Sequence, residues 1–394
     1  MTETLVFISG KRTPFGANGG SLREITPTDL AVNAGRAALE QSRVDVKDID
    51  HVIIGHVLYP AIDSIYTARH VGLKLGVPEN VPALSVNRLC GTGFQVVIEA
   101  YHQMLAGDTR IALVGGVENM SMSPYVLQSA RWGNKMGHVT IADTLTEALT
   151  DSFVKLPMAI TAETLAEKYG ISRTDCDNFA LKSQQAYQDA FKRGYFEAEI
   201  TPIPIKDKRG NVVDFKNDEH PKQDASADSL ARLKTVFKKD GVITAGNASG
   251  IVDGASVLVV ATENEAKKRG LSPLGRMISY GISGCDPKIM GIGPVPAAKE
   301  ALRRVNMKIE QMDLIEVNEA FAPQTLAVQR ELGIPMEKLN VNGGAIAVGH
   351  PLAASGSRIL MHLLYELKRR KQRWGLGSAC IGGGQGIAII VEAL

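Results

Sequence analysis

The chain has 394 residues, with 44 Lys or Arg against 42 Asp or Glu, and a net charge of +2. This balance gives no electrostatic case for binding nucleic acid or a membrane surface. Apolar residues make up 44% and charged residues 22%, a composition that supports a sizeable core, and the length suggests two or three domains. No apolar run reaches the roughly 18 residues of a membrane-spanning helix.

Two further features narrow the class of protein. The N-terminus, "MTETLVFISGKRTPFG", enters a strand-like apolar run and lacks the basic start and small-residue cleavage site of a secretory signal. The four cysteines, Cys90, Cys176, Cys285 and Cys380, lie far apart and form no CxxC pair. We therefore expect a reducing interior, without a zinc site or a disulfide framework.

In chain order, the first clear unit is "RAALEQSRVDVKDIDHVIIGHV", residues 36–57. It has the pattern of an amphipathic helix end, a polar turn and a buried strand. The same order recurs in "KEALRRVNMKIEQMDLIEVNEA", residues 299–320, where seven positions match in register without gaps, Asp50 with Asp313 among them. We infer an internal duplication.

Each copy is followed by a Val-Asn pair, at 86–87 and 341–342, and then by a glycine-containing turn. The apolar spacing predicts a helix over roughly 91–105 in the first copy and roughly 351–368 in the second. Each helix then leads into another strand with a glycine turn. The simplest account is two similar α/β halves, each with a mixed sheet covered by helices.

Residues 119–250 do not follow the helix-turn-strand pattern of the two halves. Ser172 and Asp175 form a capping box for one helix, and Gly194 ends it. A polar, Lys-rich stretch follows at 205–226, which is either a solvated face or a contact to a phosphorylated ligand. We predict an inserted loop-and-helix region over the first half. The expected division is residues 1–118 and 251–272 for the N-terminal half, 119–250 for the loop domain and 273–394 for the C-terminal half.

Reactive side chains stand inside glycine-rich sequence at three places: Cys90 in "CGTG", His350 in "GGAIAVGHP" and Cys380 in "CIGGGQG". In "VNEAF", Asn318 and Glu319 come just past a buried strand. Cys90 and His350 occupy corresponding helix starts in the two halves. If the halves pack about a pseudo-twofold axis, both starts approach one centre.

This position suits a nucleophile. A free cysteine with a pKa of about 8.5 is only a few per cent thiolate at neutral pH. A helix N-terminus lowers that pKa, and a nearby histidine can take the proton. Gly91 and Gly93 let backbone N–H groups approach a developing oxyanion.

Each of these residues also has a structural interpretation. Cys90 alone fits an inert core position, His350 a helix cap, Cys380 a tight strand turn and Asn318 a strand end. No glycine-rich segment has the spacing of a dinucleotide or phosphate loop. We assign Cys176 and Cys285 no function.

Taken together, nine stretches resemble signatures of the thiolase family, in the family's order and over nearly the whole chain. The resemblance is strongest to the mitochondrial-type 3-ketoacyl-CoA thiolases, which are acetyl-CoA acyltransferases. The stretches are "KRTPFGANGG", "NRLCGTGF", "GGVENMS", "ITAETLAEKYGISR", "TAGNASGIVDGA", "CDPKIMGIGPVPA", "VNEAFAPQ", "NGGAIAVGHP" and "SACIGGGQG".

The resemblance implies an α/β fold of two βαβαβαββ halves stacked in five layers, αβαβα, with an inserted loop domain that holds coenzyme A. It implies ping-pong thiolysis of a 3-ketoacyl-CoA to acetyl-CoA and a shortened acyl-CoA, as in fatty acid β-oxidation. Cys90, activated by His350, would attack the 3-keto carbon, and Cys380 would protonate the departing α-carbon. The alternative is a biosynthetic acetoacetyl-CoA thiolase that condenses two acetyl-CoA.

The resemblance also implies the binding groups. Asn318, through a water, and His350 would form one oxyanion site, and the backbone N–H groups of Cys90 and Gly382 would form the other. Coenzyme A is then a substrate, and no cofactor or metal is expected. The implied CoA contacts are Met158, Lys222, Phe237, Ser249, Ala320 and Phe321.

Acyl-CoA and CoA are the expected partners, with no nucleic acid, and the family implies a homodimer or homotetramer. The expected location is cytoplasmic, or the mitochondrial matrix in a eukaryote. Three departures from the family's pattern, Thr92, Lys222 and Ala353, bear on substrate preference rather than reaction type. A non-catalytic acyl-CoA binder and a thiol redox protein are the rival classes, but the first would lack a reactive residue and the second needs paired cysteines.

Overall fold

The computed structural model describes residues 3–207 and 209–394. Both halves follow the predicted βαβαβαββ order, although the third strand of the C-terminal half is reduced to one parallel bridge between Ile315 and Leu339. The N-terminal half consists of β1 (Leu5–Arg12), α1 (Pro27–Ser42), β3 (His51–Gly55), α2 (Thr67–Leu75), β4 (Ala83–Val86), α3 (Thr92–Ala106), β5 (Ile111–Glu118) and β12 (Val252–Thr262). The C-terminal half consists of β13 (Gly275–Gly284), α9 (Pro294–Arg304), β14 (Leu314–Val317), α10 (Ala322–Leu332), α12 (Leu352–Arg370), β15 (Trp374–Ile381) and β16 (Gln385–Ala393).

The strands of the two halves form one continuous sheet in the order β14-β15-β16-β13-β1-β12-β5-β3-β4. The halves meet where β1 pairs with β13, through Val6 with Arg276 and Phe7 with Gly275. Within the N-terminal half, β3 runs parallel to both β4 and β5. In the C-terminal half, β14 runs parallel to β15. Parallel strands covered on both faces read as continuous apolar runs, as these do.

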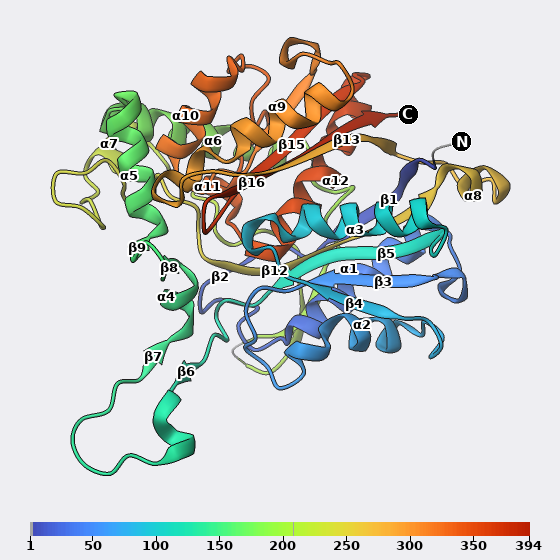
Figure 1. The fold of residues 1–394 in the computed structure, drawn as a ribbon, viewed down its shortest axis with the longest axis horizontal. Coiled ribbons are helices and arrows are strands. Elements are labelled where there is room, and N and C mark those ends of the chain that lie inside the picture. Colours follow the sequence, from blue (N-terminus) through green and yellow to red (C-terminus); the bar gives the residue numbers. More distant parts are fainter. Residues whose placement is uncertain (1–2, 208) are drawn as a thin grey trace.

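The five layers follow from the alternation of side chains along each strand. Leu5 and Phe7 of β1 enter a core between the two halves of the sheet. Val6 and Ile8 point the other way, into a core beneath α1 and α2. A third core packs α9 and α10 against the outer face of the C-terminal strands. The order of layers is therefore α1 and α2, N-terminal strands, α3 and α12, C-terminal strands, α9 and α10 (Figure 1).

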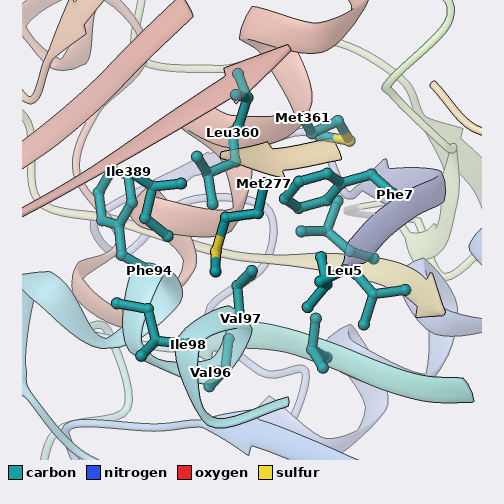
Figure 2. Close-up of a cluster of buried hydrophobic side chains, with 14 of the residues drawn as sticks. Leu5, Phe7, Phe94, Val96, Val97, Ile98, Met277, Leu360, Met361 and Ile389 are labelled. Atoms are coloured by element: carbon teal, nitrogen blue, oxygen red, sulfur yellow. The ribbon is translucent and has the colours of Figure 1, made fainter. Parts of the chain in front are cut away.

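The middle layer packs against strands of both halves. Figure 2 shows side chains from α3 and α12 meeting side chains from strands of both halves. The residues drawn and labelled there are Leu5, Phe7, Phe94, Val96, Val97, Ile98, Met277, Leu360, Met361 and Ile389.

The duplication is confirmed by the fold. In both copies a helix is followed by a single 3-10 turn, at Val46–Asp48 or Ile309–Gln311, and then by a buried strand. The helix predicted over 91–105 is α3, and Gly107 ends it in a left-handed conformation with φ of 85°. The helix predicted over 351–368 extends two residues further, because Lys371 rather than an earlier residue takes the left-handed cap, with φ of 57°.

Helices α3 and α12 cross with their backbones in contact. A Cβ atom on Gly93 would lie 2.5 Å from the backbone nitrogen of Ser357, and one on Gly356 would lie 2.3 Å from that of Phe94. Only glycine permits this approach. The crossing brings the first turns of both helices to one centre, as the duplication predicted.

The segment between β5 and β12 consists of loops, short strands and helices, and its assignment as a separate loop domain stays a prediction. The capping box of Ser172 and Asp175 is present at α6. A hairpin of β6 and β7 projects away from the layered body at the lower left of Figure 1. Within residues 3–207 and 209–394, no helix is both long and apolar enough to cross a membrane. The elements of the insertion are β6 (Tyr125–Val126), β7 (Ala142–Asp143), α4 (Thr144–Ala148), β8 (Thr150–Asp151), β9 (Leu156–Pro157), α5 (Met158–Tyr169), α6 (Arg173–Lys192), β10 (Ile203–Lys206), β11 (Val212–Phe215) and α7 (Ala227–Ala231).

Candidate active site

Cys90 lies in a 3-10 turn, Leu89–Gly91, immediately before α3. Leu89 takes a left-handed conformation with φ of 47°, and the Thr92 hydroxyl accepts a hydrogen bond of 2.8 Å from the Arg88 backbone N–H. The side-chain methyl group of Thr92 rests on Gly55, where any Cβ atom would lie 2.0 Å from it.

The Cys90 thiol is neutral at rest. Burial raises the pKa of Cys90 to about 11, although the backbone N–H groups of Gly382 and of Cys90 itself approach the sulfur and act in the opposite direction. The expectation that the helix start would lower this pKa is therefore wrong for the unliganded protein, because loss of hydration exceeds the effect of the helix N-terminus. Only about one thiol in 10⁴ is ionised at pH 7, so a base must act during attack.

His350 lies between a short helix, α11 (Ala345–Val348), and α12. Asn318 Nδ2 lies 3.4 Å from His350 Nε2, and Ser355 Oγ lies 2.5 Å from Nδ1. Because an amide NH₂ group only donates, Nε2 accepts and Nδ1 carries the hydrogen that it donates to Ser355. Burial lowers the pKa of His350 to about 3, and the positive charge of Arg358 adds to this. The ring is therefore a neutral base with its lone pair at Nε2.

Asn318 and Glu319 follow β14 and differ in role. The Asn318 backbone N–H donates to the Ser378 carbonyl at 2.9 Å, which fixes the loop to β15. Its Oδ1 is buried without a hydrogen-bond partner among the described protein groups. The Glu319 carboxyl accepts from Ser183 Oγ at 2.7 Å and from the Ile346 backbone N–H at 3.0 Å. Glu319 therefore shapes the loop before His350, and Asn318 is the residue that faces the site.

Cys380 lies on β15 and is 1% exposed, in a small cluster with Met290 and Ala320. Burial raises the pKa of Cys380 well above its usual range, and the charges of nearby Cys90 and Cys285 act in the same direction. Cys380 holds its proton firmly, as an acid awaiting a strongly basic partner.

The structure brings four of the six expected CoA residues to the Cys380 side of the site. Met158 and Phe321 pack against the cluster of Cys380 and Ala320. The Ser249 backbone N–H donates to the Ala320 carbonyl at 3.0 Å. This pairing joins the end of the loop domain to the loop that carries Asn318.

The other two CoA residues lie further out on the loop domain. Lys222 lines a cavity of about 270 Å³ with His220, Ser229 and Gly246 among its neighbours. Phe237 is 47% exposed on a hairpin, in which the neighbouring Val236 N–H donates to the Ile243 carbonyl at 3.2 Å. Neither residue touches the Cys380 cluster in the contacts of the described residues.

An apolar wall flanks Cys90. Leu89 and Cys90 both pack against it, as do Leu145 and Ala148 of α4 and Ile251. The wall itself consists of Val57, Leu58, Met120, Leu352 and Ala353, all buried. A chain attached to the Cys90 sulfur therefore finds an apolar surface beside it.

Sequence reasoning missed several members of this site. Ser355, which fixes the tautomer of His350, lies just past the quoted motif "NGGAIAVGHP" and carries no signal beyond being a hydroxyl one turn into the helix. Cys285, set aside as structural, lies beside Cys380, and its backbone N–H donates to the Gly384 carbonyl at 2.7 Å. Glu118 lies behind Cys90 and is fully buried. Among the described residues, no group of three or more His, Cys, Asp or Glu side chains is placed to hold a metal ion.

A part-buried thiol with backbone donors at its sulfur, a second, protonated thiol near it and a neutral imidazole base held by Asn318 and Ser355 suit acyl transfer coupled to carbon protonation. This site stands at the crossing of two duplicated α/β halves. The sequence model "Thiolase, N-terminal domain" matches residues 5–264, and "Thiolase, C-terminal domain" matches residues 271–393. The chain therefore belongs to the thiolase family.

Two individual relatives are similar over nearly the whole chain. The mitochondrial 3-ketoacyl-CoA thiolase of Bos taurus is 51% identical over 386 residues, covering 98% of this chain and 97% of the relative. The enzyme of the same description from Homo sapiens is 50% identical over 387 residues, with the same coverage of 98% and 97%.

Solved structures agree with this assignment. The crystal structure of human mitochondrial 3-ketoacyl-CoA thiolase matches with a TM-score of 0.98 at 49% identity and covers 100% of both chains. The structure of that enzyme in complex with CoA matches with a TM-score of 0.97, covering 100% of this chain and 98% of the other. The five-layered thiolase fold is thereby confirmed.

Proposed function

We propose that this chain catalyses the thiolytic cleavage of 3-ketoacyl-CoA by CoA, giving acetyl-CoA and an acyl-CoA shortened by two carbons, in fatty acid β-oxidation. The observation that carries this proposal is the proximity of two thiols: Cys90, with backbone N–H donors at its sulfur, and the buried Cys380. One thiol forms an acyl-enzyme, and the other supplies the proton that carbon–carbon cleavage requires. The names of the relatives above support the degradative reaction over the biosynthetic alternative.

The first half-reaction breaks the carbon–carbon bond. Cys90 attacks the 3-keto carbon while its proton passes to His350 Nε2, so that the sulfur gains a bond as the imidazolium forms. Both groups are neutral at rest, so the positive ring and the negative oxyanion appear together and stabilise each other. Collapse of the oxyanion releases the acetyl-CoA carbanion, and Cys380 gives its proton to that α-carbon.

The second half-reaction returns the enzyme to its starting state. The thiol of incoming CoA attacks the acyl-Cys90 carbonyl and loses its proton to the Cys380 thiolate left by the first step. The new thioester forms as the bond to Cys90 breaks, and the Cys90 sulfur recovers its proton from His350. Protons and charges then balance over the cycle.

The proposed oxyanion donors differ between the two steps. The Gly382 and Cys90 backbone N–H groups are well placed for an oxygen next to the Cys90 sulfur, because both approach that sulfur at rest. His350 Nε2–H, with a water held by Asn318, would stabilise the other oxyanion. The free Oδ1 of Asn318 and its 3.4 Å contact to Nε2 support this assignment.

For CoA, the proposed site lies along the loop domain, residues 119–250. Lys222, exposed at the mouth of the 270 Å³ cavity, would meet the phosphates as a point charge rather than as the planar fork of an arginine. Phe237 and Ser249 would flank the pantetheine arm, which ends beside Met158, Ala320 and Phe321. The proposed reaction uses no cofactor or metal. The proposed oligomer is a homodimer or homotetramer. The proposed location is the cytoplasm, or the mitochondrial matrix in a eukaryote.

Substrate length tests the degradative function directly. Each CH₂ that the apolar wall buries contributes up to about 0.8 kcal/mol, so six added carbons, half of them buried, favour the longer substrate by roughly 50-fold. The measurement compares kcat/KM for 3-ketodecanoyl-CoA and acetoacetyl-CoA at one CoA concentration. A ratio below one assigns the chain to the biosynthetic alternative, and a protein that binds acyl-CoA without CoA-dependent cleavage is not a thiolase at all.

A further inference from the structure

Glu118 is the last residue of β5 and is 0% exposed, yet no lysine or arginine pairs with it among the described residues. Its only basic neighbour in the described ion pairs is His56, with Nε2 3.4 Å from Oε1. A buried, unpaired carboxylate is costly, so such a group either shares a proton or is held by several N–H groups. Glu118 has both kinds of neighbour.

The hydrogen bonds around His56 locate one proton. The Thr67 hydroxyl donates to the Ser64 carbonyl at 2.7 Å, so its oxygen can only accept from His56 Nδ1, 3.2 Å away. Nδ1 therefore carries the ring hydrogen, and Nε2 presents a lone pair to Glu118. Two lone pairs would repel at this distance, so a protonated carboxyl suits the position better than a carboxylate, although the 3.4 Å approach is not a hydrogen bond in the structure.

The electrostatics of the two groups agree with a neutral pair. Burial raises the pKa of Glu118 to about 8, and burial lowers the pKa of His56 to about 4. At neutral pH the proton therefore stays on the carboxyl group. The other titratable groups that face Glu118 are Asp253 on β12 and Cys90 in the turn before α3.

Glu118 also joins the two halves of the molecule at the active site. It accepts from the backbone N–H of Leu58 at 2.9 Å and of Val57 at 3.3 Å, which follow β3. It accepts equally from the N–H of Ala353, at 3.3 Å, in the first turn of α12. Helix α12 starts at Pro351, which offers no side-chain cap, so Glu118 satisfies a donor that the helix itself leaves open.

The contact between Glu118 and Ala353 lies close in the structure to both reactive residues, Cys90 and His350. Ala353 is three residues from His350, and Ser355 in the same turn holds His350 Nδ1. Val57, Leu58 and Ala353 are members of the apolar wall against which Cys90 packs. A shift of the Glu118 carboxyl therefore moves the base and the surroundings of the nucleophile together.

We propose that Glu118 is a positioning residue for acyl transfer: its neutral carboxyl group, which lies beside His56, fixes the first turn of α12 and the 57–58 loop around Cys90. A neutral group serves here because an ionised one would oppose the thiolate that forms at Cys90. The inference rests on the proposed function for its catalytic meaning, but its geometry and charge state stand independently.

The test compares Glu118→Gln with Glu118→Ala in the full-length chain. A glutamine amide resembles a protonated carboxyl: its oxygen, in place of Oε2, accepts from Ala353 and Val57, while its NH₂ group, in place of Oε1, faces His56 and gives up only the acceptor for the Leu58 N–H. We expect Glu118→Gln to keep kcat and KM within about 3-fold at pH 7, and Glu118→Ala to lower kcat by roughly 10- to 100-fold with little change in KM.

A substrate-free readout isolates the charge. Iodoacetamide alkylation of Cys90 is followed from pH 6 to 10, with Cys90→Ala as the blank. Above the Glu118 pKa the wild-type carboxylate opposes the thiolate, so at pH 9 Glu118→Gln is expected to react up to about 10-fold faster, and the two converge at pH 7. Glu392→Ala is the control, because Glu392 is equally buried on β16 but pairs with Arg276 and Arg373 away from the site.

The outcomes separate the possibilities. Superimposable alkylation profiles for wild type and Glu118→Gln, or a Gln variant as impaired in kcat as the Ala variant, would overturn the proposal. If Glu118→Ala does not fold, the Gln profile alone decides. If the alkylation profiles of wild type and Glu118→Gln differ as predicted but the protein thiolyses no substrate, the proposed function is refuted. The positioning role then still stands, since alkylation needs no acyl-CoA.

Discussion

The two halves of the molecule start their central helices in different ways. In the N-terminal half, a 3-10 turn with Leu89 in a left-handed conformation precedes α3 and carries Cys90. In the C-terminal half, His350 and Pro351 precede α12, and the first turn of that helix is capped by Glu118 from the opposite half. The first arrangement exposes a thiol to backbone donors, and the second holds an imidazole ring in one tautomer.

This difference shows what duplication contributes to the site. Two equivalent helix starts meet because Gly93 and Gly356 let the helix backbones touch. Once the scaffold supplied two such positions at one centre, each could carry a different reactive group. The nucleophile and its base then come from separate copies, so their distance depends on the packing of the halves rather than on a local loop.

The largest effect is expected from removing the nucleophile that the N-terminal half contributes. Cys90→Ala should abolish acyl-enzyme formation and lower kcat by at least about 10⁴-fold, because it removes the sulfur that the Gly382 and Cys90 N–H groups approach. Mass spectrometry after mixing with an acyl-CoA detects the missing acyl adduct. The control is Cys176→Ala, a buried cysteine of α6 far from the site. An acyl adduct on the Cys90→Ala protein would contradict the assignment.

The next largest effect concerns the thiol that has no counterpart in the first half. Cys380→Ser should leave acyl loading of Cys90 from a simple acyl-CoA intact, yet slow carbon–carbon cleavage by roughly 10³-fold. A serine hydroxyl is too weak an acid to protonate the α-carbon. Too little of its alkoxide forms for it to act as the base in the reverse direction. Acyl loading and thiolysis are measured on the same preparation. Near wild-type thiolysis by this variant would show that another group supplies the proton.

Asn318 sharpens the comparison by separating oxyanion stabilisation from activation of the thiol. Asn318→Ala should lower kcat by roughly 10²- to 10³-fold, the usual effect of losing one oxyanion donor. The rate of Cys90 alkylation should stay nearly constant, because the 3.4 Å contact from Nδ2 to His350 is long and Ser355 still fixes the ring. A large fall in alkylation would instead make Asn318 part of the activation of Cys90.

Much of this architecture could be predicted from the chain alone. The matched segments at 36–57 and 299–320 carry the helix, turn and strand in register, and side-chain periodicity alone defines such units. The glycines at positions 91 and 93 marked the helix start correctly. The fold of the insertion was predictable only where a capping box marks it, at α6.

The acid–base properties of the site were not predictable in the same way. A helix start is visible in sequence, but the loss of hydration that raises the Cys90 pKa to about 11 depends on side chains distant in the chain. The same holds for Glu118, which meets Ala353 across 235 positions. Ser355 and Cys285 were missed because a hydroxyl or thiol near a reactive residue has no spacing rule that distinguishes it from a surface or core residue.

The smallest effect we expect concerns Ala353, which the resemblance marked as a departure from a usual glycine. The structure places it in the apolar wall beside Cys90, fully buried. Ala353→Gly removes one methyl group from that wall, so a longer acyl chain gains space, and kcat/KM for 3-ketodecanoyl-CoA relative to acetoacetyl-CoA should rise by about 2- to 4-fold. Glycine also destabilises the first turn of α12 by up to about 1 kcal/mol.

The matched control for this last variant is Ala354→Gly. Ala354 is equally buried in the same turn of α12 but does not belong to the wall beside Cys90. Both variants should lose similar thermal stability, whereas only Ala353→Gly should change the ratio of the two substrates. If the ratio moves equally in both, glycine acts through the flexibility of the helix start and thus through His350. If it moves in neither, the methyl group of Ala353 packs away from the acyl chain, and chain length is set on the Met158 side of the site.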